Sequence, residues 1–153
     1  MIYTKATLKA MNIAYEAHRD QKDKAGYPYI FHSLHLAEQM DTEDTCVVAL
    51  LHDVIEDTYM TYEDLEEAGF TKEQLDALRL LTHEEYRPGM SWEERVEKYL
   101  DYIRELKTNE IAKVVKRADL MHNLDSSRLL RKLRENDIRR LEKYQKALEI
   151  LEE

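Results

Sequence analysis

The sequence predicts an all-α protein with a single domain. Apolar residues recur at helical spacing along almost all of the 153 residues, and no segment has the alternation of a β-strand. Three glycines and two prolines are too few for the many tight turns of a β-sandwich or barrel. The chain is the size of one domain and has no linker-like or repeated segment, so residues 1–153 are predicted to share one core.

The first half of the chain is predicted to form short helices joined by loops. Gly26 and Pro28 indicate a loop after the first helix, and Gly69 ends a short helix that begins at Thr61. The other predicted segments are a helix over Thr4–Asp20, a loop over Gln21–Tyr29, and helices over Ile30–Met40 and Thr42–Asp57. In the first helix, the residues predicted to face the core are Leu8, Met11, Ile13 and Tyr15.

The second half is predicted to contain longer helices. Thr71 and Ser91 each stand three residues before a Gln or Glu, which is the capping-box pattern of a helix start. Pro88 and Gly89 indicate that His83–Met90 is the main connecting loop. Two long helices, over Asn109–Arg128 and Asn136–Glu152, complete the predicted fold.

Charge and composition exclude several classes of protein. Residues 1–70 contain 5 Lys and Arg against 14 Asp and Glu, whereas residues 71–153 contain 18 of each. This acidic balance argues against general nucleic-acid binding, in which contacts with phosphates dominate the affinity. A single cysteine excludes an intramolecular disulfide and a Cys-rich zinc site. The chain has no signal-peptide core and no apolar stretch that could span a membrane, so we expect a cytoplasmic protein.

The most informative polar residues follow an apolar run that begins at Val47. On a helix, His52 and Glu56 are four residues apart, as are Asp53 and Asp57, so the four side chains form one patch. Three carboxylates crowded beside an imidazole at the end of a buried helix repel one another unless cations or pKa shifts intervene. A divalent metal resolves this conflict, whereas a solvated helix end avoids it. The spacing alone leaves both interpretations open.

Two further residues favour the metal. His32 follows the loop that contains Pro28, and Asp119 lies on an otherwise apolar-periodic helix face beside Val115 and Leu120. Together with His52 and Asp53 they supply two nitrogen and two oxygen ligands, with positions left for water and substrate. Such a set suits Mn²⁺, Fe²⁺ or Zn²⁺ better than Ca²⁺ or Mg²⁺, which prefer shells made only of oxygen.

These residues resemble the H…HD…D signature of the HD-domain metal-dependent phosphohydrolases. Three longer segments make the resemblance more specific. They resemble the hydrolase domain of the Rel/SpoT alarmone enzymes and the small standalone (p)ppGpp hydrolases. The segments are AHRDQKDKAGYPYIFHS, ALLHDVIEDT and KRADLMHNL, and the resemblance extends over roughly residues 10–145. ALLHDVIEDT is the most specific of the three, because an isolated His-Asp doublet is common.

The resemblance implies a helical HD-domain bundle that hydrolyses the 3′-pyrophosphate of guanosine alarmones. It further implies one Mn²⁺ held by His32, His52, Asp53 and Asp119, with Fe²⁺ or Zn²⁺ as other candidates, and a pair of acids, Glu56-Asp57, that handles the water. The chemistry is consistent, because a metal lowers the pKa of a bound water and an adjacent carboxylate accepts its proton. The implied partner is a nucleotide, and neither a nucleic acid nor a membrane.

The substrate-binding residues depart in part from the family pattern. The family has Arg-Lys-Ser-Gly where this chain has Asp23-Lys24-Ala25-Gly26, so Lys24 is predicted to meet a phosphate that Asp23 repels. Asn123, four residues after Asp119, is predicted to face the site and to bind a ribose or base. Arg140 and Tyr144 resemble a phosphate-binding and base-stacking pair of the standalone hydrolases, although packing with neighbouring leucines would also explain Tyr144.

The sequence therefore predicts a metal-dependent phosphohydrolase of (p)ppGpp or a related nucleotide. Two alternatives remain: an HD-type nucleotidase or phosphodiesterase for another small phosphate ester, and a nucleotide sensor that binds metal without turnover. The pair Glu56-Asp57 argues against the sensor, which has no need of water activation. The basic run Arg128–Arg134 is predicted to be a solvated helical end.

Overall fold

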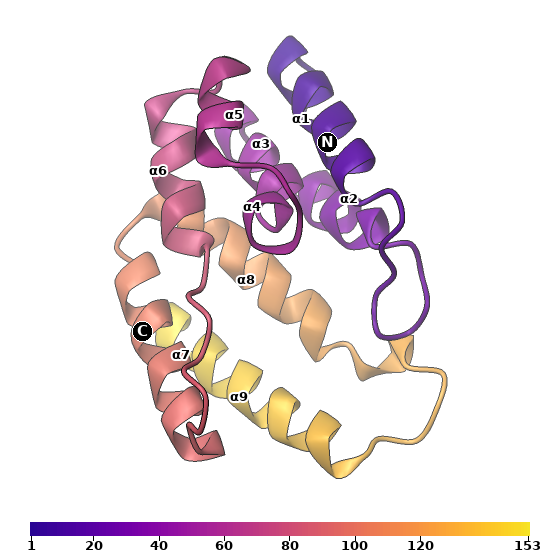
Figure 1. Cartoon of the computed structure of the whole chain (residues 1–153), viewed down its shortest axis with the longest axis vertical. Helices are drawn as coiled ribbons and strands as arrows, with labels where there is room; N and C mark the ends of the chain where they lie inside the picture. Colours follow the sequence, from indigo (N-terminus) through magenta and orange to yellow (C-terminus); the bar gives the residue numbers. More distant parts are fainter.

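The computed structural model describes residues 1–153 and confirms the all-α prediction (Figure 1). Nine α-helices and one 3₁₀ turn follow one another without a strand. The helices are α1 (Lys5–Ala17), α2 (Ile30–Glu38), α3 (Glu43–Leu51), α4 (Val54–Asp57), α5 (Tyr62–Glu67), α6 (Lys72–Leu81), α7 (Trp92–Leu106), α8 (Glu110–Leu124) and α9 (Glu135–Glu152), with the 3₁₀ turn η1 over Ser126–Arg128.

The helix α3 lies at the centre of the fold. It contacts α1, α2, α6 and α8, and its residues Thr45–Leu51 are all buried. The helix α8 contacts both α3 and α9, so it joins the N-terminal helices to the layer formed by α7 and α9 (Figure 1). A single cluster of 28 buried apolar residues extends from the N-terminal helices to the layer of α7 and α9. None of the helices combines the length and the apolarity that a membrane crossing requires.

The predicted helix starts at Thr71 and Ser91 are confirmed. Both bonds of the capping box form at Thr71, where the side chain accepts from Gln74 N and Gln74 Oε1 accepts from Thr71 N. Ser91 Oγ accepts from Glu94 N at 3.1 Å. These bonds satisfy backbone donors that the first turn of a helix leaves free.

The first helix is shorter than predicted, and only two of its four predicted core residues, Met11 and Ile13, pack against the core. It ends at Ala17 rather than Asp20, and Leu8 and Tyr15 are 60% and 57% exposed. The buried residues are instead Ala10 and Ala14, together with Thr7. Because Ala10 and Ala14 are small, α1 packs closely on α3, whereas Leu8 and Tyr15 are left exposed. Hydrophobic spacing did not predict this, since it favours large residues.

The predicted helix over Thr42–Asp57 is two helices in the structure. Helix α3 ends at Leu51, and α4 begins at Val54 after Asp53, whose φ of −105° and ψ of 0° are not helical. The Nδ1 atom of His52 donates to the carbonyl oxygen of Ala49 at 2.7 Å at this break. The break therefore holds His52 and Asp53 at the end of the most deeply buried helix of the protein.

The long helix near the C-terminus also ends earlier than predicted. It ends at Leu124 instead of Arg128, because the Asp125 side chain accepts from Ser127 N at 3.1 Å and starts the turn η1. Arg128 consequently lies on an irregular segment, and its side chain is only 25% exposed. The prediction that the basic run is a solvated helical end is wrong in part, because residues 129–134 are not helical and Arg128 is mostly buried. Arg131 and Lys132 are exposed as predicted.

Candidate active site

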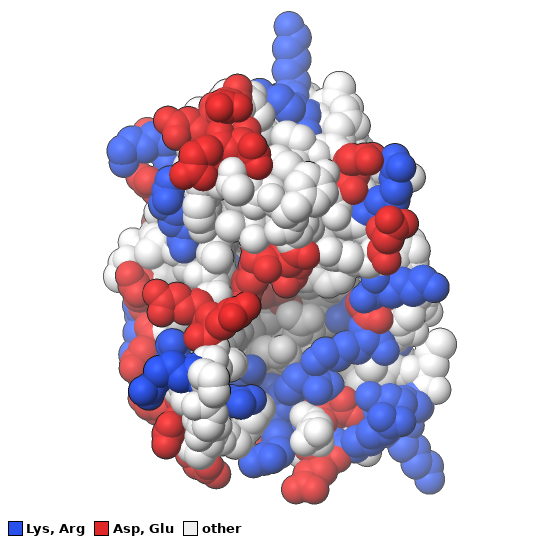
Figure 2. Space-filling view, viewed as in Figure 1, with Lys and Arg blue, Asp and Glu red and all other residues white.

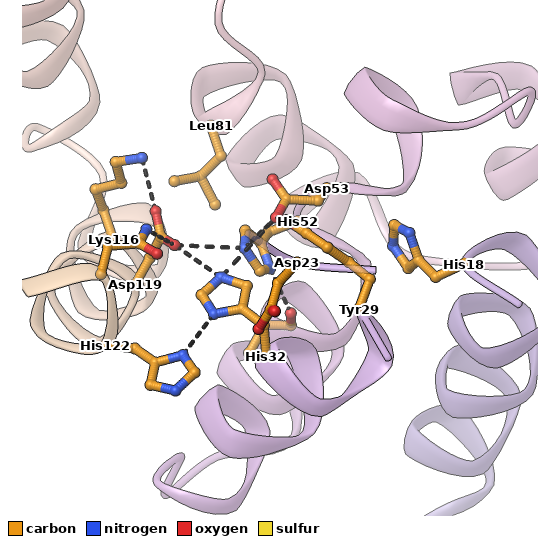
Figure 3. Close-up of polar contacts among 12 residues, drawn as sticks. His18, Asp23, Tyr29, His32, His52, Asp53, Leu81, Lys116, Asp119 and His122 are labelled. Carbon is orange, nitrogen blue, oxygen red and sulfur yellow. Dashed lines mark hydrogen bonds and ion pairs between the residues drawn. The ribbon is translucent and has the colours of Figure 1, made fainter. Parts of the chain in front are cut away.

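The four predicted metal ligands converge at one point between α2, α3 and α8 (Figure 3). The ligand atoms of His32, His52 and Asp53 all lie within 4.8 Å of one another. Asp119 Oδ1 joins them from α8, at 2.9 Å from His32 Nε2 and 3.8 Å from His52 Nε2. All four side chains are buried or nearly so. Residues up to 87 positions apart thus supply two nitrogens and two carboxylate oxygens to one small volume.

The protonation of His52 indicates that this cluster fits a cation. Its Nδ1 carries the proton donated to the Ala49 carbonyl, so a neutral ring directs the Nε2 lone pair toward Asp53 and Asp119. The buried Nε2 atom makes no hydrogen bond, although Asp53 Oδ2 is 2.9 Å away. Burial opposes the charged ring, but the two carboxylates outweigh it and hold the pKa of His52 well above its usual range. A metal ion would also neutralise the two carboxylates, and the histidine could then remain neutral and bind the ion through Nε2.

Three further side chains orient the carboxylates of the cluster. The Tyr29 hydroxyl donates to Asp53 Oδ2. On α8, Lys116 Nζ lies 2.8 Å from Asp119 Oδ2, and Asn123 Nδ2 donates to Asp119 Oδ1 at 3.0 Å. Tyr29 and Lys116 were missed by the sequence reasoning, although both lie in the quoted motifs: Lys116 is three residues before Asp119, on the same helix face.

Two connected cavities adjoin the cluster. The inner cavity has a volume of about 290 Å³ and is lined by the four ligand candidates, Glu56 and Asp57. The outer cavity measures about 600 Å³. Figure 2 shows a hollow on this face, with acidic side chains along its upper edge and basic side chains along its lower edge. The residues that line both cavities are Asp23, Tyr29, Asp57, Asn123, Arg128 and Tyr144.

The acids Glu56 and Asp57 lie on the short helix α4 at the wall of the inner cavity. Partial burial of the carboxyl groups and the charge of Asp53 raise the pKa of Glu56 to about 7 and that of Asp57 to about 6. Both residues keep part of their surface open to solvent. Carboxyl groups with such pKa values exchange protons readily near neutral pH, which is what a general base requires.

The four predicted substrate-binding residues, Lys24, Asn123, Arg140 and Tyr144, all line the outer cavity. Arg140 is held by the buried carboxylate of Asp137 at 2.5 Å. Lys24 lies on the predicted loop, which turns at Gly26 with a φ of +93°. Burial, followed by the charge of Arg140, lowers the pKa of Lys24, so two cations repel each other across this cavity.

Lys143 is a further cation that the sequence reasoning missed. Its ammonium lies 4.5 Å from the centre of the Tyr99 ring and 5.1 Å from that of Tyr144, and it forms no ion pair with a carboxylate. It lines the inner cavity with Lys116. Burial, followed by the charge of Lys116, lowers the pKa of Lys143 to about 8. Its place on the partly exposed face of α9 resembles that of any surface lysine, so nothing in the sequence distinguished it.

Asp23 has a role that the sequence did not predict. Its Oδ1 accepts from the backbone N–H groups of Ala25 and Tyr27 at 2.9 and 3.0 Å, and its Oδ2 lies 3.2 Å from Arg128 Nη1. The residue therefore fixes its own loop and pairs with an arginine. The charge that the sequence analysis expects to repel phosphates is partly neutralised.

Comparisons with known proteins agree with the observed fold. No model of a known protein family matches the chain. It is 35% identical over 125 residues to the guanosine-3′,5′-bis(diphosphate) 3′-pyrophosphohydrolase MESH1 of Xenopus tropicalis, a match that covers 76% of the chain and 66% of the relative. The MESH1 of Danio rerio is 32% identical over 130 residues, which is 79% of the chain and 68% of the relative.

Longer relatives are covered only in small part, as for the 3′-pyrophosphohydrolase of Aquifex aeolicus, which the chain matches over 9% of its length. A solved structure described as a metazoan orthologue of SpoT that hydrolyses ppGpp has a TM-score of 0.81. The superposition covers 99% of this chain and 88% of that one, and at 23% identity it shows a shared fold. The fold and the identity to MESH1 over two thirds of its length together show that the chain belongs to the family of guanosine-3′,5′-bis(diphosphate) 3′-pyrophosphohydrolases.

Proposed function

We propose that the chain hydrolyses the 3′-pyrophosphate of (p)ppGpp or of a closely related nucleotide. The observation that carries the proposal is the contrast between the two sides of the cavities. A His/Asp cluster and two acids lie on one side, and four cations lie on the other: Lys24, Lys116, Arg140 and Lys143. Lys24 and Lys143 form no ion pair with a carboxylate, and burial together with the charges of Arg140 and Lys116 lowers their pKa values. A ligand with several negative charges relieves the repulsion among these cations.

The metal ligands in this proposal are His32, His52, Asp53 and Asp119. We infer Mn²⁺ as the ion, because a mixed set of imidazole and carboxylate ligands suits Mn²⁺, Fe²⁺ and Zn²⁺ better than the all-oxygen cations. Such an ion supplies a coordinated water of lowered pKa and offsets the charge of the pyrophosphate. Tyr29, Lys116 and Asn123 hold the carboxylates in position from outside the cluster.

The remaining residues of the inner cavity handle the proton and the pyrophosphate. Glu56 and Asp57 orient the attacking water and accept its proton, for which pKa values of about 7 and about 6 are well matched to neutral pH. The water oxygen forms a bond to phosphorus while the bond from phosphorus to the ribose 3′ oxygen breaks. The leaving 3′ oxygen takes up a proton, and the products are pyrophosphate and a nucleotide that has a free 3′ hydroxyl and keeps its 5′ phosphates, which is GDP in the case of ppGpp. Lys143 faces the pyrophosphate, since no carboxylate of the protein neutralises it.

The outer cavity binds the nucleoside and its other phosphates. Lys24 and Arg140 supply positive charge there, and Asn123 offers an amide for the ribose or base. Tyr144 lines both cavities, so its ring is available to stack on a base beside the reacting group. The volume of about 600 Å³ is within the range of cavities that hold ligands of this size.

The test is incubation of the Mn²⁺-loaded protein with ppGpp and with a panel of other nucleotides and phosphate esters. We expect release of pyrophosphate and GDP from ppGpp, with one Mn²⁺ per chain by elemental analysis. Release of orthophosphate, with a preference for another ester, would identify a nucleotidase or phosphodiesterase instead. Binding of ppGpp without turnover of any compound would identify a sensor.

A further inference from the structure

Arg128 occupies a distinctive place between the two cavities. Of the six residues that line both cavities, it is the only cation. Lys24 and Arg140 line only the outer cavity, whereas Lys116 and Lys143 line only the inner one. Any ligand that extends from the metal ligands into the outer cavity passes this guanidinium.

The contacts of Arg128 leave part of its donor capacity unused. Its Nη1 donates to Asp23 Oδ2 at 3.2 Å, and its Nη2 lies 3.5 Å from Asn123 Oδ1, at the limit of a hydrogen bond. Its Nε atom is buried and has no hydrogen-bond partner. A guanidinium has five N–H donors, and a buried donor without a partner is unfavourable. A phosphate oxygen at this point would satisfy it.

Asp23 fixes the orientation of Arg128. Two backbone N–H groups of its own loop, from Ala25 and Tyr27, bind Asp23 Oδ1, so the carboxylate has little freedom to move. Its second oxygen is thereby directed at the guanidinium. An arginine that is already oriented loses less side-chain entropy when it binds a ligand than a free one does.

We propose that Arg128, oriented by Asp23, determines specificity by binding a phosphate of the nucleotide other than the pyrophosphate that is cleaved. Lys116, Lys143 and the metal ligands already serve the inner cavity, and Arg128 lies where that cavity opens to the outer one. The site therefore selects nucleotides that carry a second phosphate group, such as a nucleoside 5′-diphosphate. This inference rests on the proposed function only for the identity of the cleaved group.

Titration calorimetry of the Mn²⁺-loaded protein with GDP and, separately, with inorganic pyrophosphate tests the proposal. We expect Arg128→Ala to weaken GDP binding at least about tenfold, as for the loss of a charge-assisted hydrogen bond, and to change pyrophosphate binding less than about threefold. Lys132→Ala is the matched control, because Lys132 is an exposed cation of the same segment that lines neither cavity. It should change neither affinity.

The double variant Asp23→Asn/Arg128→Ala distinguishes a direct contact from an indirect one. The amide introduced by Asp23→Asn keeps the oxygen that binds the loop but removes the charge that Arg128→Ala leaves unpaired. If GDP binding stays weak in the double variant, Arg128 binds the phosphate directly. If the affinity returns to that of the parent, the single variant acted through repulsion by Asp23, and the proposal is wrong.

Two other results would also overturn the inference: a parent protein that does not bind GDP, or an Arg128→Ala variant in which only pyrophosphate binding is weakened. Turnover is measured separately on ppGpp, where Arg128→Ala should raise KM with kcat within about threefold of the parent. A parent that binds GDP through Arg128 but does not cleave ppGpp refutes the proposed function and leaves this inference standing.

Discussion

The inner and outer cavities differ in what builds their walls. The inner cavity is lined mostly by residues of helices α2, α4, α6, α7, α8 and α9 and by His52 and Asp53 at the break between α3 and α4. The carboxylates of the proposed metal site have hydrogen-bonding partners, as Asp119 has in Lys116 and Asn123. The outer cavity is bounded largely by the loop of residues 21–29 and the irregular segment that follows α8. The proposed chemistry therefore relies mainly on residues held by helices, whereas the proposed choice of ligand relies on loops and their ion pairs.

The largest expected effect is loss of a metal ligand in the inner cavity. His52→Ala should abolish stoichiometric Mn²⁺ binding and reduce ppGpp turnover to background, because the proposed site would lose one of its two nitrogen donors. Elemental analysis and a turnover assay measure both effects, and circular dichroism verifies folding. His35→Ala is the control, since His35 is an exposed histidine on α2, the helix that carries His32. A His52 variant that keeps one tightly bound Mn²⁺ per chain would disprove the ligand assignment.

The next largest effect is expected from variants of the inner cavity that remove the proposed proton acceptors but leave the metal ligands in place. Glu56→Gln and Asp57→Asn should each keep Mn²⁺ but lose kcat by at least about 10²-fold, as for removal of a positioned general base. The substitutions preserve shape and remove only the charge. Kinetics and elemental analysis on the same samples give the answer. Turnover within a few-fold of the parent in both variants would mean that the acids are only a charged helix end.

A smaller effect is expected in the outer cavity. Lys24→Met should raise KM for ppGpp about tenfold with kcat nearly unchanged, because the lost charge contacts the bound nucleotide and not the reacting group. Steady-state kinetics measure both constants. Lys132→Ala, outside the cavity, should leave both constants as they are. A fall in kcat with constant KM would contradict the proposal that the outer cavity binds the nucleotide and the inner cavity carries out the reaction.

The smallest effect concerns stability of the metal-free protein. The pKa of Glu56 is raised from 4.5 to about 7, so the folded state holds a proton that the unfolded state releases, and stability falls as pH rises from about 4.5 to about 7. Glu56→Gln removes the titrating group and with it this pH-dependent loss of stability. We expect its Tm at pH 7.5 to exceed that of the parent by about 2 °C, which allows for solvent screening of a partly exposed group. The difference in Tm between variant and parent should vanish near pH 4. Equal Tm values of the two proteins at pH 7.5 as well as at pH 4 would refute the prediction.

The convergence of His32, His52, Asp53 and Asp119 was predicted from the sequence, because the family motifs that they resemble group these four residues. The positions at which the helices break were not predicted from the sequence. A local bond ends α8 at Asp125, and this end moves Arg128 from a solvated helix to the wall of both cavities. The place of Lys143 depends instead on tertiary packing against Tyr99 of α7. The residues that the sequence reasoning missed thus depend on local side-chain bonds at helix ends and loops, as for Arg128, or on packing between distant helices, as for Lys143.

The convergence of donors from α2, α3 and α8 has a consequence beyond catalysis. An ion held by residues as far apart as His32 and Asp119 would act as a cross-link that closes a long stretch of chain around the core. Ligands that bind only the folded state stabilise it by mass action, by about 2.7 kcal/mol at a concentration one hundred times Kd. The lifetime of this protein against unfolding and proteolysis would then follow the supply of metal in its surroundings.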